Sequence, residues 1–168
     1  MTGLYYFDTE FIEQRGYLEP ISIGMVCEDG REFYAVSNEF HVDRADPWVV
    51  ANVIAKLPPL SQRTSLATIA VDLRAFVVDD APSFVAYFAS YDWVVLCWLL
   101  GGRMVDVPKG WPMFPMDLKQ AMVERGVTRR MLPAQPAGTE HNALDDARWV
   151  RDAHAVVYKY APIFAHAP

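Results

Sequence analysis

The sequence predicts an α/β fold, in which a mixed β-sheet is flanked by helices. Two alternating segments, 20–27 and 31–38, surround an Asp-Gly pair, which is typical of a β-hairpin. The strand-like segment 4–12 precedes them, so the chain begins with a three-strand antiparallel meander. Helical and strand-like segments then alternate, which favours parallel strands added to the same sheet.

The middle of the chain is punctuated by proline and by changes in hydrophobic periodicity. A short helix is expected at 46–57, where Pro58 and Pro59 end it. A second helix is expected at 65–79 from its spacing of apolar residues. The short apolar segment 83–89 carries no charge, and we expect it to be a strand of the same sheet.

Glycine, proline and capping residues delimit the elements of the C-terminal part. We expect a buried helix closed by Gly101 and Gly102, then a proline-rich loop with room for one short strand. Asp117 is the expected N-cap of the next helix, which stops at Gly126. The expected ranges are helix 91–100, loop 103–116, helix 117–125, loop 127–140 and helix 142–160.

Length and composition favour a single domain that covers residues 1–168. Half of the residues are hydrophobic, which suits a chain with a proper core. The longest apolar run, 93–100, is too short to span a bilayer, and no signal peptide precedes the first strand. Cys27 and Cys97 stand alone in apolar segments, so we expect buried thiols, no membrane partner and a cytoplasmic location.

The first strand contains two carboxylates where a central strand should be apolar. Asp8 and Glu10 are two residues apart and therefore share one face of the strand. A solvated outer face is the alternative, but the aromatic residues Tyr5, Phe7 and Phe11 indicate a central strand. Because like charges repel there, this segment favours a bound cation over that alternative.

Two further acids interrupt apolar patterns. Asp92 lies at the start of an apolar helix, where it can act as an N-cap, as a ligand at the end of a strand, or as both. In HNALDDA, helical phase places Asp145 on the polar side and Asp146 on the apolar side, with Trp149 and Tyr160. Asn142 is the expected N-cap, which leaves His141 on the preceding loop.

These acids suit a hard divalent cation. Mg²⁺ prefers oxygen ligands and is commonly held by a few carboxylates, waters and phosphate oxygens, and Mn²⁺ can substitute for it. Two such ions can clamp a phosphodiester for in-line displacement. His141 then offers a base that can take a proton from water near neutral pH.

The segments FDTEF, YDWVVL and HNALDDA together resemble the three motifs of the DEDDh 3′–5′ exonucleases. The ordered set is specific, and a histidine five residues before the last aspartate selects the His subclass. Within that family, the short chain is similar to the small polyadenylate-specific 3′-exoribonucleases. An asparagine that the family often carries before the second-motif aspartate is absent, because residues 87–90 read Tyr-Phe-Ala-Ser.

The resemblance implies an RNase H-like fold and a role for each motif residue. Asp8 bridges two ions, Glu10 and Asp146 complete the site of the ion beside the attacking water, and Asp92 is a ligand through water. His141 is the general base. Phe11 resembles positions that line the terminal nucleotide, although a place in the core is equally compatible with its sequence context.

Charge is unevenly distributed in this acidic chain. The net charge of −6 argues against a generic nucleic-acid binder, but residues 101–132 hold six basic residues against three acidic ones. With the resemblance in view, we expect Arg129 and Arg130 to help bind an RNA backbone, a solvated basic surface being the alternative.

The expected function is therefore a two-metal 3′–5′ exoribonuclease. It would release nucleoside 5′-monophosphates from single-stranded RNA 3′ ends or overhangs, and adenosine-rich tails are one candidate substrate. A DNA-directed exonuclease of the same fold and a non-catalytic nucleic-acid-binding or dimerisation domain are the alternatives. Analogy with relatives also favours a homodimer, for which surplus aromatic residues such as Trp48, Trp111 and Phe164 could provide an interface.

Overall fold

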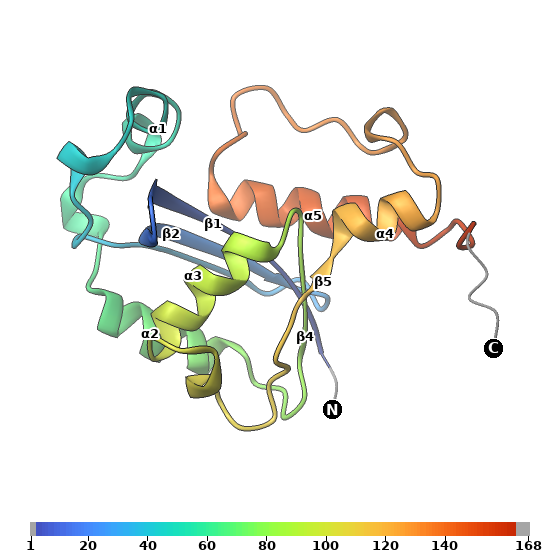
Figure 1. The fold of residues 1–168 in the computed structure, drawn as a ribbon, viewed down its shortest axis with the longest axis horizontal. Helices are drawn as coiled ribbons and strands as arrows, with labels where there is room; N and C mark the ends of the chain where they lie inside the picture. The colour runs from blue at the N-terminus through green and yellow to red at the C-terminus, as the bar shows by residue number, and fades with distance from the viewer. Residues whose placement is uncertain (1–2, 164–168) are drawn as a thin grey trace.

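A five-stranded mixed sheet forms the centre of the computed structural model, which describes residues 3–163 (Figure 1). The strand order is β3-β2-β1-β4-β5. The first three strands form the expected antiparallel meander, and β4 and β5 are parallel to β1 and β4 respectively. The bounds are β1 Leu4–Gln14, β2 Tyr17–Cys27, β3 Glu32–Val36, β4 Ser83–Ala86 and β5 Met116–Asp117. The expected fold class is confirmed.

Helices cover both faces of the sheet. Successive side chains of β1 point to opposite faces, and apolar residues on each face pack against helices. Tyr5 and Phe7 pack against α2 and α3, whereas Tyr6 packs against α4 and α5. The bounds are α1 Pro47–Asn52, α2 Leu66–Phe76, α3 Ser90–Leu100, α4 Leu118–Glu124 and α5 Ala143–Val157.

Several element boundaries differ from those expected; the helix expected at 65–79, for example, is Leu66–Phe76, and the first two strands are longer than expected. The helix expected at 46–57 is divided into α1 and a 3₁₀ turn, Ile54–Lys56, because Val53 turns inward to pack with Ile12 and Ile21. Strand β4 ends at Ala86, and the chain then turns through Phe88, whose φ is +59°.

The last expected helix, 142–160, ends at Val157. Tyr160 follows the helix and is exposed, so its assignment to the apolar face was wrong. Two expected N-caps are confirmed. Asp117 accepts a hydrogen bond from the backbone N–H of Gln120, and Asn142 accepts two from the first turn of α5.

Gly24 allows α5 to approach the sheet closely. It pairs with Asp8 across β1 and β2, and a Cβ atom at this position would lie 2.2 Å from the backbone of Ala143. No side chain fits in that space, because real Cβ contacts are never so short. The N-terminal turn of α5 therefore rests on the sheet beside Asp8.

Two other expectations concern the state of the cysteines and the presence of membrane-spanning helices. Cys27 and Cys97 are buried free thiols, as expected. Within residues 3–163, no helix combines the length and the apolar character that a membrane span requires.

Candidate active site

An open cleft of about 370 Å³ lies where β1, the start of α3 and the start of α5 meet. The five residues singled out from the sequence all contribute to its wall, although they come from three distant segments. The lining consists of Asp8, Thr9, Glu10, Phe11, Tyr87, Phe88, Tyr91, Asp92, Arg129, Gln135, His141, Asp146, Trp149 and Val150.

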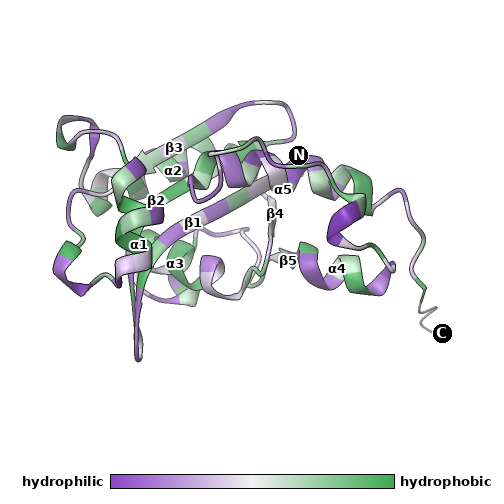
Figure 2. Cartoon of the chain, turned by 90° about the horizontal axis from the view of Figure 1, so that it is seen from above, coloured by the Kyte–Doolittle hydropathy of each residue, from purple (hydrophilic) through white to green (hydrophobic). Residues whose placement is uncertain are grey.

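Asp8 and Glu10 belong to the middle of β1, where hydrophilic residues interrupt the apolar pattern of the strand (Figure 2). Burial raises the pKa of Asp8 well above its usual range, and the neighbouring carboxylates raise it further. Burial, followed by Asp146 and Asp92, raises the pKa of Glu10 to about 8, which Lys56 partly offsets. The fold therefore holds these carboxylates together against their mutual repulsion.

Asp92 is fixed at the edge of β1, beyond the end of β4. It is only 7% exposed, and its Oδ1 accepts hydrogen bonds from the Thr9 backbone N–H (2.9 Å) and the Thr9 hydroxyl (2.7 Å). The side chain satisfies a β1 donor that β4 is too short to reach. Burial raises its pKa to about 6, although the bonds from Thr9 act in the opposite direction. Asp92 is not the N-cap of α3, since Ala89 takes that position without a side-chain bond.

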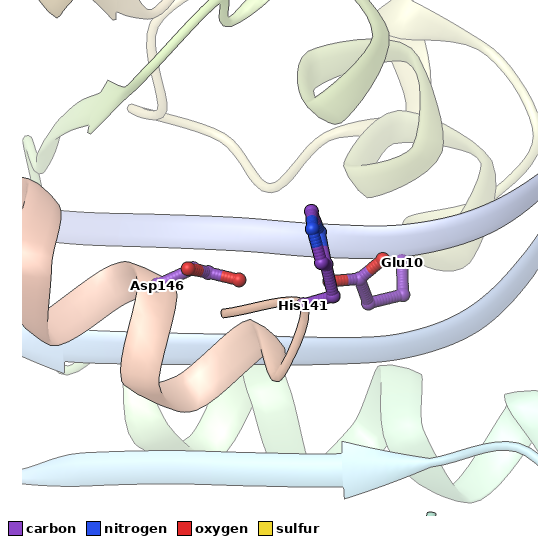
Figure 3. Close-up of side chains that lie close together, drawn as sticks. All are labelled: Glu10, His141 and Asp146. Atoms are coloured by element: carbon purple, nitrogen blue, oxygen red, sulfur yellow. The ribbon is translucent and has the colours of Figure 1, made fainter. Parts of the chain in front are cut away.

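Asp146 projects from the first turns of α5 toward β1 (Figure 3). Ligand atoms of Glu10, His141 and Asp146 all lie within 4.8 Å of one another, so these three groups can hold a metal ion. Gln135 donates a hydrogen bond to Oδ1 of Asp146. Burial raises the pKa of Asp146, and the Gln135 bond lowers it in part.

His141 occupies the last loop position before α5, directly ahead of the N-cap Asn142. Its φ of +62° is uncommon for a residue with a Cβ atom. Figure 3 shows its imidazole beside Glu10, on the loop that leads into α5. The structure thus places His141 outside the helix, as expected.

The donor set fits hard divalent cations. Four carboxylates and one imidazole face a single cleft, and three of the carboxylates raise the pKa of the fourth. Oxygen-rich sites of this kind are those that Mg²⁺ and Mn²⁺ prefer. Asp8 and Asp92 are not part of the group formed by Glu10, His141 and Asp146. The cleft therefore has further carboxylate oxygens that could bind a second ion.

Without metal, the protein is expected to lose stability as the pH rises from about 4 to about 8. The folded pKa values of Glu10 (about 8) and Asp92 (about 6) lie above those of the free side chains. The folded state therefore binds more protons in this window, and its advantage disappears as the pH passes the folded pKa values.

The expected loss is on the order of a few kcal/mol, which thermal unfolding in EDTA would reveal as a melting temperature lower by roughly 5 °C or more. Added Mg²⁺ or Mn²⁺ should remove the slope, since the ions replace the protons. A melting temperature that rises with pH in EDTA would contradict this interpretation of the carboxylates.

Of the three expected substrate-binding residues, Phe11 and Arg129 line the cleft and Arg130 does not. Phe11 lines the cleft and meets Tyr91 edge to face, with ring centroids 5.8 Å apart. Arg129 also lines the cleft, and its guanidinium lies 4.2 Å from the centroid of a Trp149 ring. Arg130 is exposed on the same 3₁₀ turn but does not line the cleft.

Several cleft residues were not identified from the sequence. Gln135 lies in the proline-rich loop, and its contact with Asp146 depends on the fold of that loop. Tyr87 and Phe88 occupy the stretch where the expected asparagine is missing, and both line the cleft. The replacement of the expected asparagine by aromatic residues could have indicated these positions, since aromatic residues in a turn at a strand end suggest a binding surface.

The expected RNase H-like fold is shared by solved structures of exonucleases. Exonuclease I from Methylocaldum szegediense superposes with a TM-score of 0.65 at 14% identity, covering 95% of this chain and 40% of that one. Escherichia coli exonuclease I in complex with a dT13 oligonucleotide gives a TM-score of 0.62 at 14% identity, with 95% and 41% coverage. This chain spans about two fifths of those proteins, and the likeness shows the fold alone.

Residues 4–158 match the model of the 3′–5′ exoribonuclease Rv2179c-like domain. The chain belongs to that family. The 3′–5′ exoribonucleases Rv2179c and MT2234.1 of two Mycobacterium tuberculosis strains are each 43% identical to it over 149 residues, 86% of either chain. The expected resemblance to 3′–5′ exonucleases is confirmed, and the enzyme class is that of a 3′–5′ exoribonuclease.

Proposed function

We propose that the cleft hydrolyses single-stranded RNA from its 3′ end and releases nucleoside 5′-monophosphates with two bound divalent ions, Mg²⁺ or, as a substitute, Mn²⁺. The convergence of four carboxylates and one histidine on one open cleft carries this proposal. When bound, the ions would polarise the scissile phosphate and stabilise the charge that develops on it.

Each of the five residues has a distinct task in this proposal. Asp8, Glu10 and Asp146 would hold the ions, and Asp92 would complete the set of ligands. The hydrogen bonds from Thr9 leave Oδ2 of Asp92 free to take part. His141 takes the proton of the attacking water, which a histidine at the mouth of the site can pass on to solvent.

Phe11, Arg129 and Arg130 are the proposed contacts to RNA. Phe11 can stack on the terminal base or sugar, and Arg129, which also lines the cleft, can reach a phosphate. Arg130 would act on a more distant part of the strand. A preference for adenosine-rich tails or overhangs would follow from stacking in this aromatic cleft, since purines stack well.

A second candidate is a DNA-directed exonuclease. Exonuclease I, which shares the fold, is described in complex with dT13, so single-stranded DNA is a substrate that the architecture can accept. Discrimination would depend on contacts to the 2′-hydroxyl group. We favour RNA because the curated relatives are exoribonucleases.

We also propose a cytoplasmic homodimer. The two buried free thiols suit a reducing compartment. Of the aromatic residues expected at an interface, Trp111 is buried, and Phe164 lies outside the residues that the structure describes. Exposed apolar side chains in the proline-rich loop, among them Met104, Val105 and Phe114, would supply an interface. Sedimentation or light scattering would test the oligomeric state.

The function is tested by incubating 5′-labelled RNA with a single-stranded 3′ overhang in the presence of Mg²⁺. We expect a ladder of products shortened from the 3′ end, with mononucleotides bearing a 5′-phosphate, and no activity in EDTA. A matched DNA strand separates the two candidates, and adenosine-tailed and uridine-tailed strands test base preference. Internal cleavage fragments would contradict an exonuclease.

A further inference from the structure

The segment between β3 and α2, which contains α1, contacts the loop that carries His141. Trp48 of α1 lies beside the imidazole, with ring centroids 4.7 Å apart and an interplanar angle of 78°. This edge-to-face arrangement is one that aromatic pairs prefer. Trp48 is also 53% exposed, so it contributes little to the core.

A second bond ties the same two segments together. The ammonium group of Lys56 donates a hydrogen bond to the backbone carbonyl of Glu140, over 2.8 Å. Glu140 immediately precedes His141. The α1 segment therefore contacts the loop at two consecutive residues, once through a side-chain ring and once through the backbone.

The conformation of His141 makes such support necessary. A φ of +62° is uncommon for a residue with a Cβ atom and persists where the surroundings hold it. On the other side of His141, Asn142 and α5 fix the chain. Trp48 and Lys56 hold the chain on the side that leads into His141.

The α1 segment is itself held rigidly enough to act as a support. Asp46 caps α1 by accepting hydrogen bonds from the backbone N–H groups of Trp48 and Val49. Val53 anchors the other end in a small core with Ile12 and Ile21. A helix that is capped at one end and anchored at the other thus fixes the position of Trp48. Trp48 in turn restricts the imidazole of His141, against which it packs.

We propose that Trp48 and Lys56 are positioning residues for His141. They hold its imidazole over the cleft in the orientation that proton transfer requires. The inference builds on the proposed base role of His141, and it assigns to the α1 segment a part in catalysis instead of a part in a dimer interface.

The test is a double-mutant cycle with the full chain. We expect Trp48→Ala to lower kcat about tenfold with little change in KM, because a small misplacement of a catalytic group is costly. In a His141→Ala background, the same substitution should change kcat by less than about twofold, since two residues that act as a unit are not additive. Trp48→Phe, which keeps a ring, should restore most of the loss.

Two further variants complete the cycle. Lys56→Met should lower kcat as Trp48→Ala does, and Lys56→Arg, which keeps a donor, should not. Val50→Ala is the matched control, because Val50 is exposed on α1 and lines neither the cleft nor the contact with His141. It should leave kcat and KM unchanged.

A readout without turnover is the proton spectrum of the histidine rings in the metal-free protein. The His141 signals, assigned by their loss in His141→Ala, should move in Trp48→Ala when the ring current disappears, and stay in Val50→Ala. Equal losses of kcat in both backgrounds, a loss confined to KM, or unmoved His141 signals would overturn the proposal. Failure of the underlying function is seen separately, as a His141→Ala enzyme that remains fully active, and that result would remove both.

Discussion

Asp8→Asn is expected to reduce kcat/KM by about 10³-fold or more, and at the same time to stabilise the metal-free protein. The loss of activity follows because Asp8 is central to the proposed ion site, and charge stabilisation by bound ions is worth several kcal/mol. The gain in stability follows because the other carboxylates repel Asp8 and burial penalises its charge. Asparagine keeps the volume and removes the charge.

The measurements are steady-state hydrolysis of labelled RNA and thermal unfolding in EDTA at a pH of about 9, above the folded pKa of Glu10, where more of the carboxylates carry charge. A matched pair on α5 provides the control. Asp146→Asn should behave as Asp8→Asn does, whereas Asp145→Asn should retain activity, because Asp145 is paired with Arg148 at 2.6 Å and does not line the cleft. A fully active Asp8→Asn enzyme would refute the two-ion assignment, and a destabilised one would refute the electrostatic account.

The sequence predicted the elements that local chemistry determines. The Asp-Gly turn, the alternation of β1 and the caps at Asp117 and Asn142 depend on neighbouring residues, and they were assigned correctly. The separation of Asp145 from Asp146 by helical phase also holds in the structure, where Asp145 pairs outward and Asp146 lines the cleft. A carboxylate on an otherwise apolar face was therefore informative by itself.

Features that depend on tertiary contacts could not be predicted in the same way. The division of helix 46–57 arises from the burial of Val53 against two strands, which no local pattern reveals. Asp92 has the local environment of an N-cap, and its bonds to Thr9 exist because β4 ends early. Gln135 reaches Asp146 through a loop without periodicity. In each case the decisive partner lies far away in the sequence.

The role of Trp48 illustrates the same limit. An exposed aromatic residue in a sequence is compatible with a dimer interface, a ligand contact or an ordinary surface position. Only the spatial contact with His141, which is more than ninety positions away in the chain, suggests a function within the active site. The sequence supplied the chemical groups, and the fold decides which of them meet.

His141→Ala is expected to lower kcat by about 10²–10⁴-fold, the usual contribution of a positioned base, while divalent-ion binding remains. In the wild-type enzyme at saturating Mg²⁺, kcat should increase with pH, since a general base acts only in its unprotonated form. The variant should lose this dependence.

Besides the pH profile, two measurements separate a base from a metal ligand, which matters because ligand atoms of His141, Glu10 and Asp146 lie within 4.8 Å of one another. Calorimetry with Mn²⁺ should give the same stoichiometry in wild type and His141→Ala. Added imidazole should restore part of the activity of the variant, because it can enter the open cleft in place of the missing ring. A variant that binds one ion fewer, or that keeps the wild-type pH profile, would assign His141 to the metal instead of to the proton.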